Sequence, residues 1–207
     1  MTLQDLLIDQ LSHTDAVQWA ILVLGVWEVF LAKANNIWLY PAGIGATLLS
    51  VAVLFSSGLF AESLLNVYYV IMSGYGWWFW TQKKDQPPVK ITRANRTDWT
   101  ITVCITAGGT LGLYFILKEF TPSTVPVWDA WVSATAWAGM WLLARRKVEN
   151  WILLNISNAF AIPLLLSKEL PLFGVLTLFL FAVACFGYVE WIRIARQEKI
   201  ASQALIT

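Results

Sequence analysis

The chain has 207 residues, of which 58% are hydrophobic and 13% are charged, and its mean hydropathy is +0.62. A soluble domain is typically about half apolar and about a quarter charged, so this composition excludes an ordinary soluble domain and indicates a helical membrane protein. The net charge of +1 shows no overall excess of basic residues, and we therefore expect no nucleic-acid partner.

Seven apolar runs recur along the chain, most of about 16 to 22 residues, which is the length that crosses a hydrocarbon core of about 30 Å as a helix. Because backbone amides cannot be left unpaired in lipid, these runs must be helical. Many of the thirteen tryptophans stand at the ends of the runs, as in the aromatic belts of membrane proteins. The predicted spans are Ala16–Leu31, Ile37–Phe55, Leu59–Trp80, Trp99–Leu117, Val127–Ala144, Trp151–Leu166 and Pro171–Ile192.

The basic residues predict how these spans are oriented. With the N-terminus outside, twelve of the fourteen Lys and Arg residues fall on the inner side, and only Lys118 and Lys168 fall outside. Cytoplasmic loops of membrane proteins carry such an excess, so we expect an outer N-terminus and a cytoplasmic C-terminus. The one long polar loop, Thr81–Asp98, is expected to separate an N-terminal half from a C-terminal half.

The two halves resemble each other at a nearly constant spacing. A Trp, a Lys and an Asn near the first loop recur 114 residues later, and a Gly and a Trp in the third span recur 111 residues later. This predicts a single membrane domain (1–207) with three-helix bundles over 16–80 and 127–192 and a linker helix over 99–117, a 3+1+3 parallel repeat of the SWEET type. The pairs are Trp27/Trp141, Lys33/Lys147, Asn36/Asn150, Gly76/Gly187 and Trp80/Trp191.

The sequence gives no support for catalysis. The single histidine is His13, and the sequence motifs of zinc and serine hydrolases do not occur. Cys104 and Cys185 lie inside apolar runs, where they are typical of small buried residues and not of a disulfide or a metal site. We therefore expect a protein that is not an enzyme, with no catalytic residue, no metal and no cofactor.

Few carboxylates lie within the spans. Glu28, Glu62 and Glu190 are near span ends, and we interpret them as side chains that snorkel to the membrane interface. Asp129 stands between two tryptophans at the mouth of a span and is a candidate binding residue. A proton relay would need several ionisable groups at mid-depth, so the pattern favours facilitated transport over proton coupling.

Two spans carry polar and aromatic residues along one helical face. Buried amides can act as interhelical hydrogen bonds worth about 1 kcal/mol each, or they can form a solute site, where an amide both donates and accepts; both interpretations remain open. Aromatic walls beside amides suit a flat heteroaromatic ring, and a cationic ring better still. The candidates are Asn66, Tyr69, Ser73 and Trp77 in the third span and Trp151, Asn155 and Asn158 in the sixth.

Four stretches carry a family resemblance. Residues Asn66–Trp80 read NVYYVIMSGYGWWFW and Arg146–Asn158 read RKVENWILLNISN, with WDAW at Trp128–Trp131 and GYVEW at Gly187–Trp191. Together they resemble the PnuC family of bacterial vitamin transporters, best known for nicotinamide riboside. The resemblance covers roughly residues 17 to 193, nearly the whole chain.

The resemblance implies a SWEET-like 3+1+3 fold in the bacterial inner membrane, assembled as a homotrimer within the lipid bilayer. It implies facilitated diffusion of nicotinamide riboside, followed by trapping through a cytosolic kinase. It nominates Asn66, Tyr69, Trp77, Trp151 and Asn158 as solute-binding residues. Relatives carry thiamine, riboflavin or deoxynucleosides, so thiamine is an alternative substrate; a non-transporting membrane scaffold is a further alternative.

Overall fold

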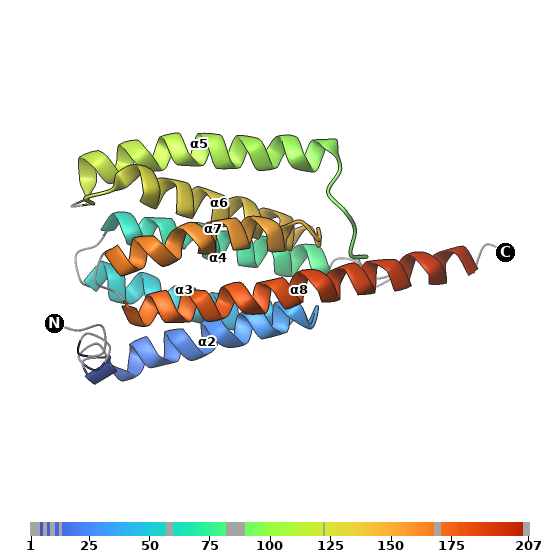
Figure 1. The fold of residues 1–207 in the computed structure, drawn as a ribbon, viewed down its shortest axis with the longest axis horizontal. Helices are drawn as coiled ribbons and strands as arrows, with labels where there is room; N and C mark the ends of the chain where they lie inside the picture. Colours follow the sequence, from blue (N-terminus) through green and yellow to red (C-terminus); the bar gives the residue numbers. More distant parts are fainter. Residues whose placement is uncertain are drawn as a thin grey trace.

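The computed structural model describes residues 5, 8, 11, 12, 14–56, 60–81, 90–121, 123–167 and 171–204. From residue 16 onward these residues form seven helices that run side by side as one bundle (Figure 1). Each helix overlaps one predicted span, which confirms the all-helical architecture. The helices are α2 (Ala16–Lys33), α3 (Leu39–Ser56), α4 (Phe60–Thr81), α5 (Arg96–Phe120), α6 (Pro126–Ala144), α7 (Asn150–Ser167) and α8 (Pro171–Ala204).

Local capping signals explain where two of the helices begin. Asp15 accepts a hydrogen bond from the backbone N–H of Gln18 at 2.7 Å, and the Gln18 side chain accepts one from the backbone N–H of Asp15 at 3.1 Å, which is a capping box at the start of α2. Asn95 and Asp98 form the same box at the start of α5, with distances of 2.8 and 3.0 Å. Helix α5 therefore begins before the apolar run that predicted it.

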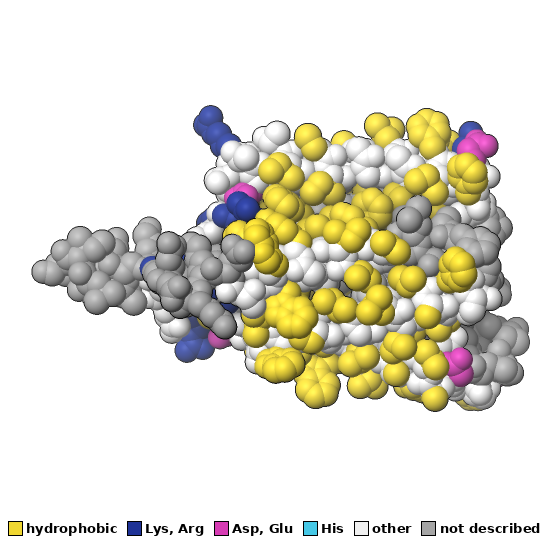
Figure 2. Space-filling view, turned by 180° about the vertical axis from the view of Figure 1, so that it is seen from behind, with side chains coloured by type: hydrophobic (Ala, Val, Ile, Leu, Met, Phe, Trp, Pro, Cys, Tyr) yellow, Lys and Arg dark blue, Asp and Glu magenta, His cyan; other side chains and the backbone are white. Residues whose placement is uncertain are grey.

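The surface of the bundle suits a bilayer. Within the described part of the chain, α2, α3, α5, α7 and α8 are long and apolar enough to cross a membrane. Helices α4 and α6 fall short of the hydropathy required of a span, and both are rich in tryptophan and other aromatic or polar residues. Hydrophobic side chains cover the middle of one face, and charged side chains gather toward its two ends (Figure 2). This is the distribution expected of a multi-pass membrane protein.

Six of the helices pack into a closed ring. Each neighbours the next in the order α2, α3, α4, α6, α7, α8, and α8 packs against α2 to close the ring. Helix α5 lies outside the ring against α6 (Figure 1). Among the described residues α3 and α7 do not pack against each other, so the side chains on their inner faces border the middle of the ring.

The turns after α2 and α6 have the same backbone shape. Asn35 and Arg146 both have φ of 54°, the left-handed region that commonly ends a helix. The residue after each donates its N–H, at 2.9 Å, to a carbonyl five residues earlier. Equivalent positions in the two turns, Asn35 and Arg146, are 111 residues apart in the sequence. The sequence pattern had predicted 114 residues for this part of the chain.

An aromatic pair also recurs in both halves. Tyr40 of α3 meets Trp80 of α4 edge-on, with ring centroids 5.1 Å apart at 89°, and Trp151 of α7 meets Trp191 of α8 at 5.7 Å and 88°. The glycine four residues before each tryptophan leaves room for the partner ring, since a Cβ at Gly187 would lie 2.8 Å from Trp151. These glycines let α4 and α8 approach their neighbours closely.

Candidate functional site

The α4 candidates do not share one environment. Ser73 is buried, Asn66 and Tyr69 are partly buried, and Trp77 is 42% exposed. Its neighbour in the chain, Trp78, is 54% exposed, so this stretch of α4 presents both tryptophans at the surface. The Tyr69 ring lies 6.0 Å from that of Tyr68, which packs on α6. Of the four, Tyr69 lies nearest the interior.

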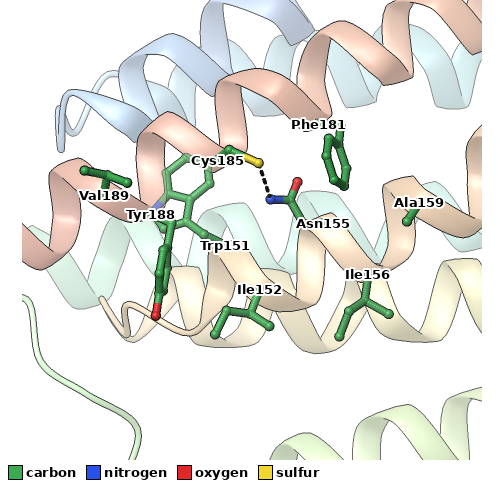
Figure 3. Close-up of a pocket in the computed structure, with 9 residues that line it drawn as sticks. All are labelled: Trp151, Ile152, Asn155, Ile156, Ala159, Phe181, Cys185, Tyr188 and Val189. Atoms are coloured by element: carbon green, nitrogen blue, oxygen red, sulfur yellow. Dashed lines mark hydrogen bonds between the residues drawn. The ribbon is translucent and has the colours of Figure 1, made fainter.

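The α7 candidates Trp151 and Asn155 pack against α8. Trp151 is 1% exposed, and Asn155 donates from Nδ2 to the Cys185 sulfur at 3.4 Å (Figure 3). Both line a groove of about 520 Å³ between α7 and α8. Ile152 and Val189, which also line this groove, are 38% and 65% exposed, so the groove opens on the outer surface of the ring.

Asn158 points the other way. Helix α7 contacts α6 through Ser157, whose hydroxyl donates to the Val132 carbonyl at 2.8 Å, and its exposed side carries Ile152 and Ile156. At about 100° per residue, Asn158 falls on the side away from these isoleucines and is turned toward the interior of the ring. It makes no hydrogen bond to any residue that the structure describes.

Asp129 has a local role in the structure. It lies in the first turn of α6, and its Oδ2 accepts a hydrogen bond from the Ser123 hydroxyl at 2.6 Å. The bond fixes the loop between α5 and α6. Asp129 therefore lies at the end of the bundle that carries the loop between α5 and α6.

Glu28, which we expected to snorkel to the interface, is turned into the ring. Its carboxylate occupies the space beside Gly43 of α3, where any Cβ would collide with it. Glu28 also interacts electrostatically with Tyr40 of α3 and Tyr69 of α4. Helix α2 does not pack against α4, so Glu28 and Tyr69 are brought near each other by α3, which packs against both helices. Of the other two carboxylates that we expected at the interface, Glu190 is partly exposed on α8, and the Glu62 side chain lies outside the described residues.

Tyr40 completes an interior site with Glu28 and Tyr69, here called the inner carboxylate site. Tyr40 is 1% exposed, and its hydroxyl has no hydrogen-bond partner in the described part of the structure. Buried hydroxyls are normally paired, so the unpaired Tyr40 hydroxyl, which lies against Gly76 of α4, leaves hydrogen-bonding capacity at the edge of the interior. At the 111-residue spacing between the two halves, Glu28 aligns with Gly139, so one half carries a carboxylate where the other has no side chain. This difference is the sequence signal for the site.

Hydrogen bonds tie the two halves together at the end that carries the α2–α3 and α6–α7 turns, here called the turn end. Trp80 Nε1 donates to the Ala144 carbonyl at 3.0 Å, and Trp191 Nε1 donates to the Ala32 carbonyl at 2.9 Å. The Arg146 guanidinium lies 4.0 Å from the centre of the Trp80 ring. Burial lowers the pKa of Arg146 below its usual value, and Glu198 partly offsets this.

The segment before α5 also closes this end. Thr92 pairs with the α6–α7 turn through two backbone bonds, Thr92 N to the Arg146 carbonyl at 3.1 Å and Val148 N to the Thr92 carbonyl at 3.0 Å. Lys147 Nζ donates to the Thr92 hydroxyl at 3.0 Å and lies 3.1 Å from the Asp98 carboxylate. The turn end is thereby held by both polar and aromatic contacts.

A ring of membrane helices with an apolar exterior and polar groups turned inward is the architecture of a carrier for a small solute. A family model described as nicotinamide mononucleotide transporter matches residues 15–193, and the chain belongs to that family. This confirms the resemblance found in the sequence and the assignment to membrane transport.

Individual relatives agree with the family. The chain is 23% identical over 203 residues to the nicotinamide riboside transporter PnuC of Escherichia coli K12, with 85% of this chain and 84% of the relative covered. The same figures hold for the PnuC transporter of Shigella flexneri. The crystal structure of the vitamin B3 transporter PnuC superposes with a TM-score of 0.70 at 20% identity, covering 94% of this chain and 88% of that one. The structural likeness supports the fold.

Proposed function

We propose that this protein imports nicotinamide riboside across the bacterial inner membrane by facilitated diffusion. The observation that carries the proposal is the interior of the ring, which Tyr69 of α4 and Asn158 of α7 border with an aromatic group and an amide group. An aromatic face suits the pyridinium ring, and an amide can both donate to and accept from ribose hydroxyls. The names of the relatives support the same solute.

The scaffold is a 3+1+3 parallel repeat in this proposal, with bundles over 16–80 and 127–192 and the linker helix over 99–117. Its support is reciprocal packing: α2 meets α8, and α6 meets α4, so that the first helix of each half contacts the third helix of the other. The matching turns and the matching aromatic pairs also support the proposed repeat.

Transport then proceeds by rocking of the two halves about the interior site. The turn end is cytoplasmic in this scheme, because the basic residues Arg145, Arg146 and Lys147 lie there and cytoplasmic loops are rich in Lys and Arg. Solute enters from outside while the turn end is tied. The Trp80 and Trp191 hydrogen bonds must break before solute is released inward.

The cellular context completes the proposal. A cytosolic kinase traps the imported vitamin by phosphorylation, so the carrier itself is not an enzyme and needs no ion gradient. Three copies form a homotrimer in the bilayer. The N-terminus lies outside and the C-terminus inside. Thiamine is the alternative solute, because it is also a flat heteroaromatic cation and suits an interior carboxylate equally well.

Titration calorimetry of the purified chain in detergent tests the solute, with nicotinamide riboside, thiamine and riboflavin as ligands. Micromolar or tighter binding of nicotinamide riboside alone supports the proposal, and binding of thiamine alone transfers it to the alternative solute. In liposomes, uptake that survives collapse of the proton gradient supports facilitated diffusion. Silence from all three ligands favours the scaffold interpretation and overturns the proposal.

A further inference from the structure

Glu28 breaks the symmetry between the two halves. At the 111-residue spacing, the α2–α3 contact of Glu28 with Gly43 corresponds to the α6–α7 contact of Gly139 with Leu154. A Cβ at Gly139 would lie 2.9 Å from the Leu154 side chain, and a Cβ at Gly43 would collide with the Glu28 carboxylate. One half therefore fills this space with an aliphatic side chain and the other with a carboxylate.

Packing alone does not explain the carboxylate. Burying a charged group in a membrane protein costs free energy unless it is paired, so an aliphatic residue would fill the space at lower cost, as Leu154 does in the other half. Glu28 keeps some exposed surface, and it forms no hydrogen bond or ion pair with any residue that the structure describes. The side chain is therefore available to a ligand.

The nearby cationic side chains are occupied elsewhere. Lys33, five residues further along α2, holds its ammonium 5.5 Å from the centre of the Phe186 ring of α8. Arg146 donates to the Asn35 side chain at 2.6 Å and stacks over Trp80. The positive charge that would offset Glu28 is therefore not supplied by these residues.

Two tyrosines make the surroundings of Glu28 suitable for a cationic ring. Tyr40 and Tyr69 come from α3 and α4 and both interact electrostatically with Glu28. Tyrosine faces attract cations, and Tyr69 is the partly exposed one of the two, because Tyr40 is packed against Gly76 and Trp80. A carboxylate beside an aromatic side chain is the chemistry that recognises a flat organic cation.

We propose that Glu28 is the counter-charge for the cationic ring of the transported solute, and that it makes the carrier select permanently cationic aromatic solutes over uncharged ones of the same shape. The inference rests on the proposed function, since it assumes that an aromatic vitamin enters the ring. It assigns specificity to a residue of α2 that the sequence pattern alone places at the membrane interface.

Nicotinamide riboside and its reduced form, dihydronicotinamide riboside, make a matched pair of probes. They have nearly the same shape, but the oxidised ring is cationic and the reduced ring is neutral. The full chain in detergent is titrated with each. We expect the wild type to bind the cation roughly tenfold or more tightly than the neutral form, as one full charge in a partly desolvated site predicts.

The Glu28→Gln variant keeps the shape of the side chain and removes its charge. We expect its affinity for the cation to fall by roughly tenfold, while its affinity for the neutral form changes by less than about twofold. Glu190→Gln is the matched control, because it removes a carboxylate of α8 that is outside the inner carboxylate site. It should keep the wild-type preference.

The outcomes separate this inference from the proposed function. Wild-type protein that binds both forms equally, or Glu28→Gln protein that keeps the preference for the cation, overturns the inference and leaves transport of the vitamin standing. Wild-type protein that binds neither form nor thiamine overturns both. If Glu28→Gln does not fold, the Glu28→Asp variant and the wild-type protein decide the question. A preference for the cation that is kept in Glu28→Asp supports the inference. Equal affinities of the wild-type protein for the oxidised and reduced forms overturn it.

Discussion

Asn35 and Arg146 have the same left-handed backbone, with φ of 54°, and they bond to each other: the Arg146 guanidinium donates to the Asn35 side-chain oxygen at 2.6 and 3.2 Å. They occupy matching positions in the turns that follow α2 and α6. The two turns therefore contact each other through residues at matching positions, which is the contact that the proposed repeat predicts.

This contact predicts a measurable coupling. Asn35→Gly removes the carboxamide but fits the left-handed backbone, so it isolates the loss of the hydrogen bond from any strain. A double-mutant cycle of Asn35→Gly with Arg146→Ala should give a coupling of about 1.5–3 kcal/mol in the free energy of unfolding, the range for hydrogen bonds to charged groups. Unfolding in detergent measures it. A coupling near zero would contradict the structural importance of this bond.

Two glycines of α4 give a second prediction with an internal control. A methyl at Gly76 would collide with the Tyr40 ring, whereas a methyl at Gly74 would meet nothing within 4 Å. Gly76→Ala should therefore lower the free energy of unfolding by about 1–3 kcal/mol, because it overpacks the α3–α4 contact. Gly74→Ala should be neutral or slightly stabilising, because alanine favours helix. Equal effects at the two positions would argue against the packing described here.

The two asparagines of α7 should behave differently in transport. Asn158 is turned toward the interior, so Asn158→Leu should reduce solute affinity by roughly tenfold through loss of its hydrogen bonds. Asn155 bonds to Cys185 in the outer groove, so Asn155→Leu should leave affinity unchanged and alter only stability. Calorimetry and uptake in liposomes check both. Normal uptake by Asn158→Leu would support the interpretation of the asparagines as interhelical bonds.

Trp151 is expected to act mainly through stability. Its ring is enclosed by Gly187 and Trp191, so Trp151→Ala should leave a cavity and cost about 3–5 kcal/mol in the free energy of unfolding. Trp151→Phe, which keeps an aromatic ring at the contact, should cost less. Solute stacking on Trp151 would instead appear as a loss of affinity of about 1–3 kcal/mol in a variant of normal stability.

The sequence by itself determined the class, the helices and the family. Long apolar runs must be helical in lipid, and tryptophans and basic residues mark their ends, so each predicted span overlaps one of the seven observed helices. The motifs in α4, α7 and α8 identified the family that the comparisons confirm. The polar extension of α8 to Ala204 was missed, because hydropathy does not detect a helix that leaves the membrane.

Only the tertiary structure decided which side of each helix faces the interior. In a soluble protein the apolar stripe reveals the inner face, but a membrane helix is apolar toward both lipid and protein, so that signal is weak. The sequence therefore allowed Glu28 to be an interfacial residue, whereas in the structure its carboxylate packs beside Gly43 of α3. The sequence likewise placed Trp151, Asn155 and Asn158 in one site, whereas in the structure the first two pack against α8. The physical reason is that neighbouring helices, which no local pattern specifies, set the rotation of each helix about its own axis.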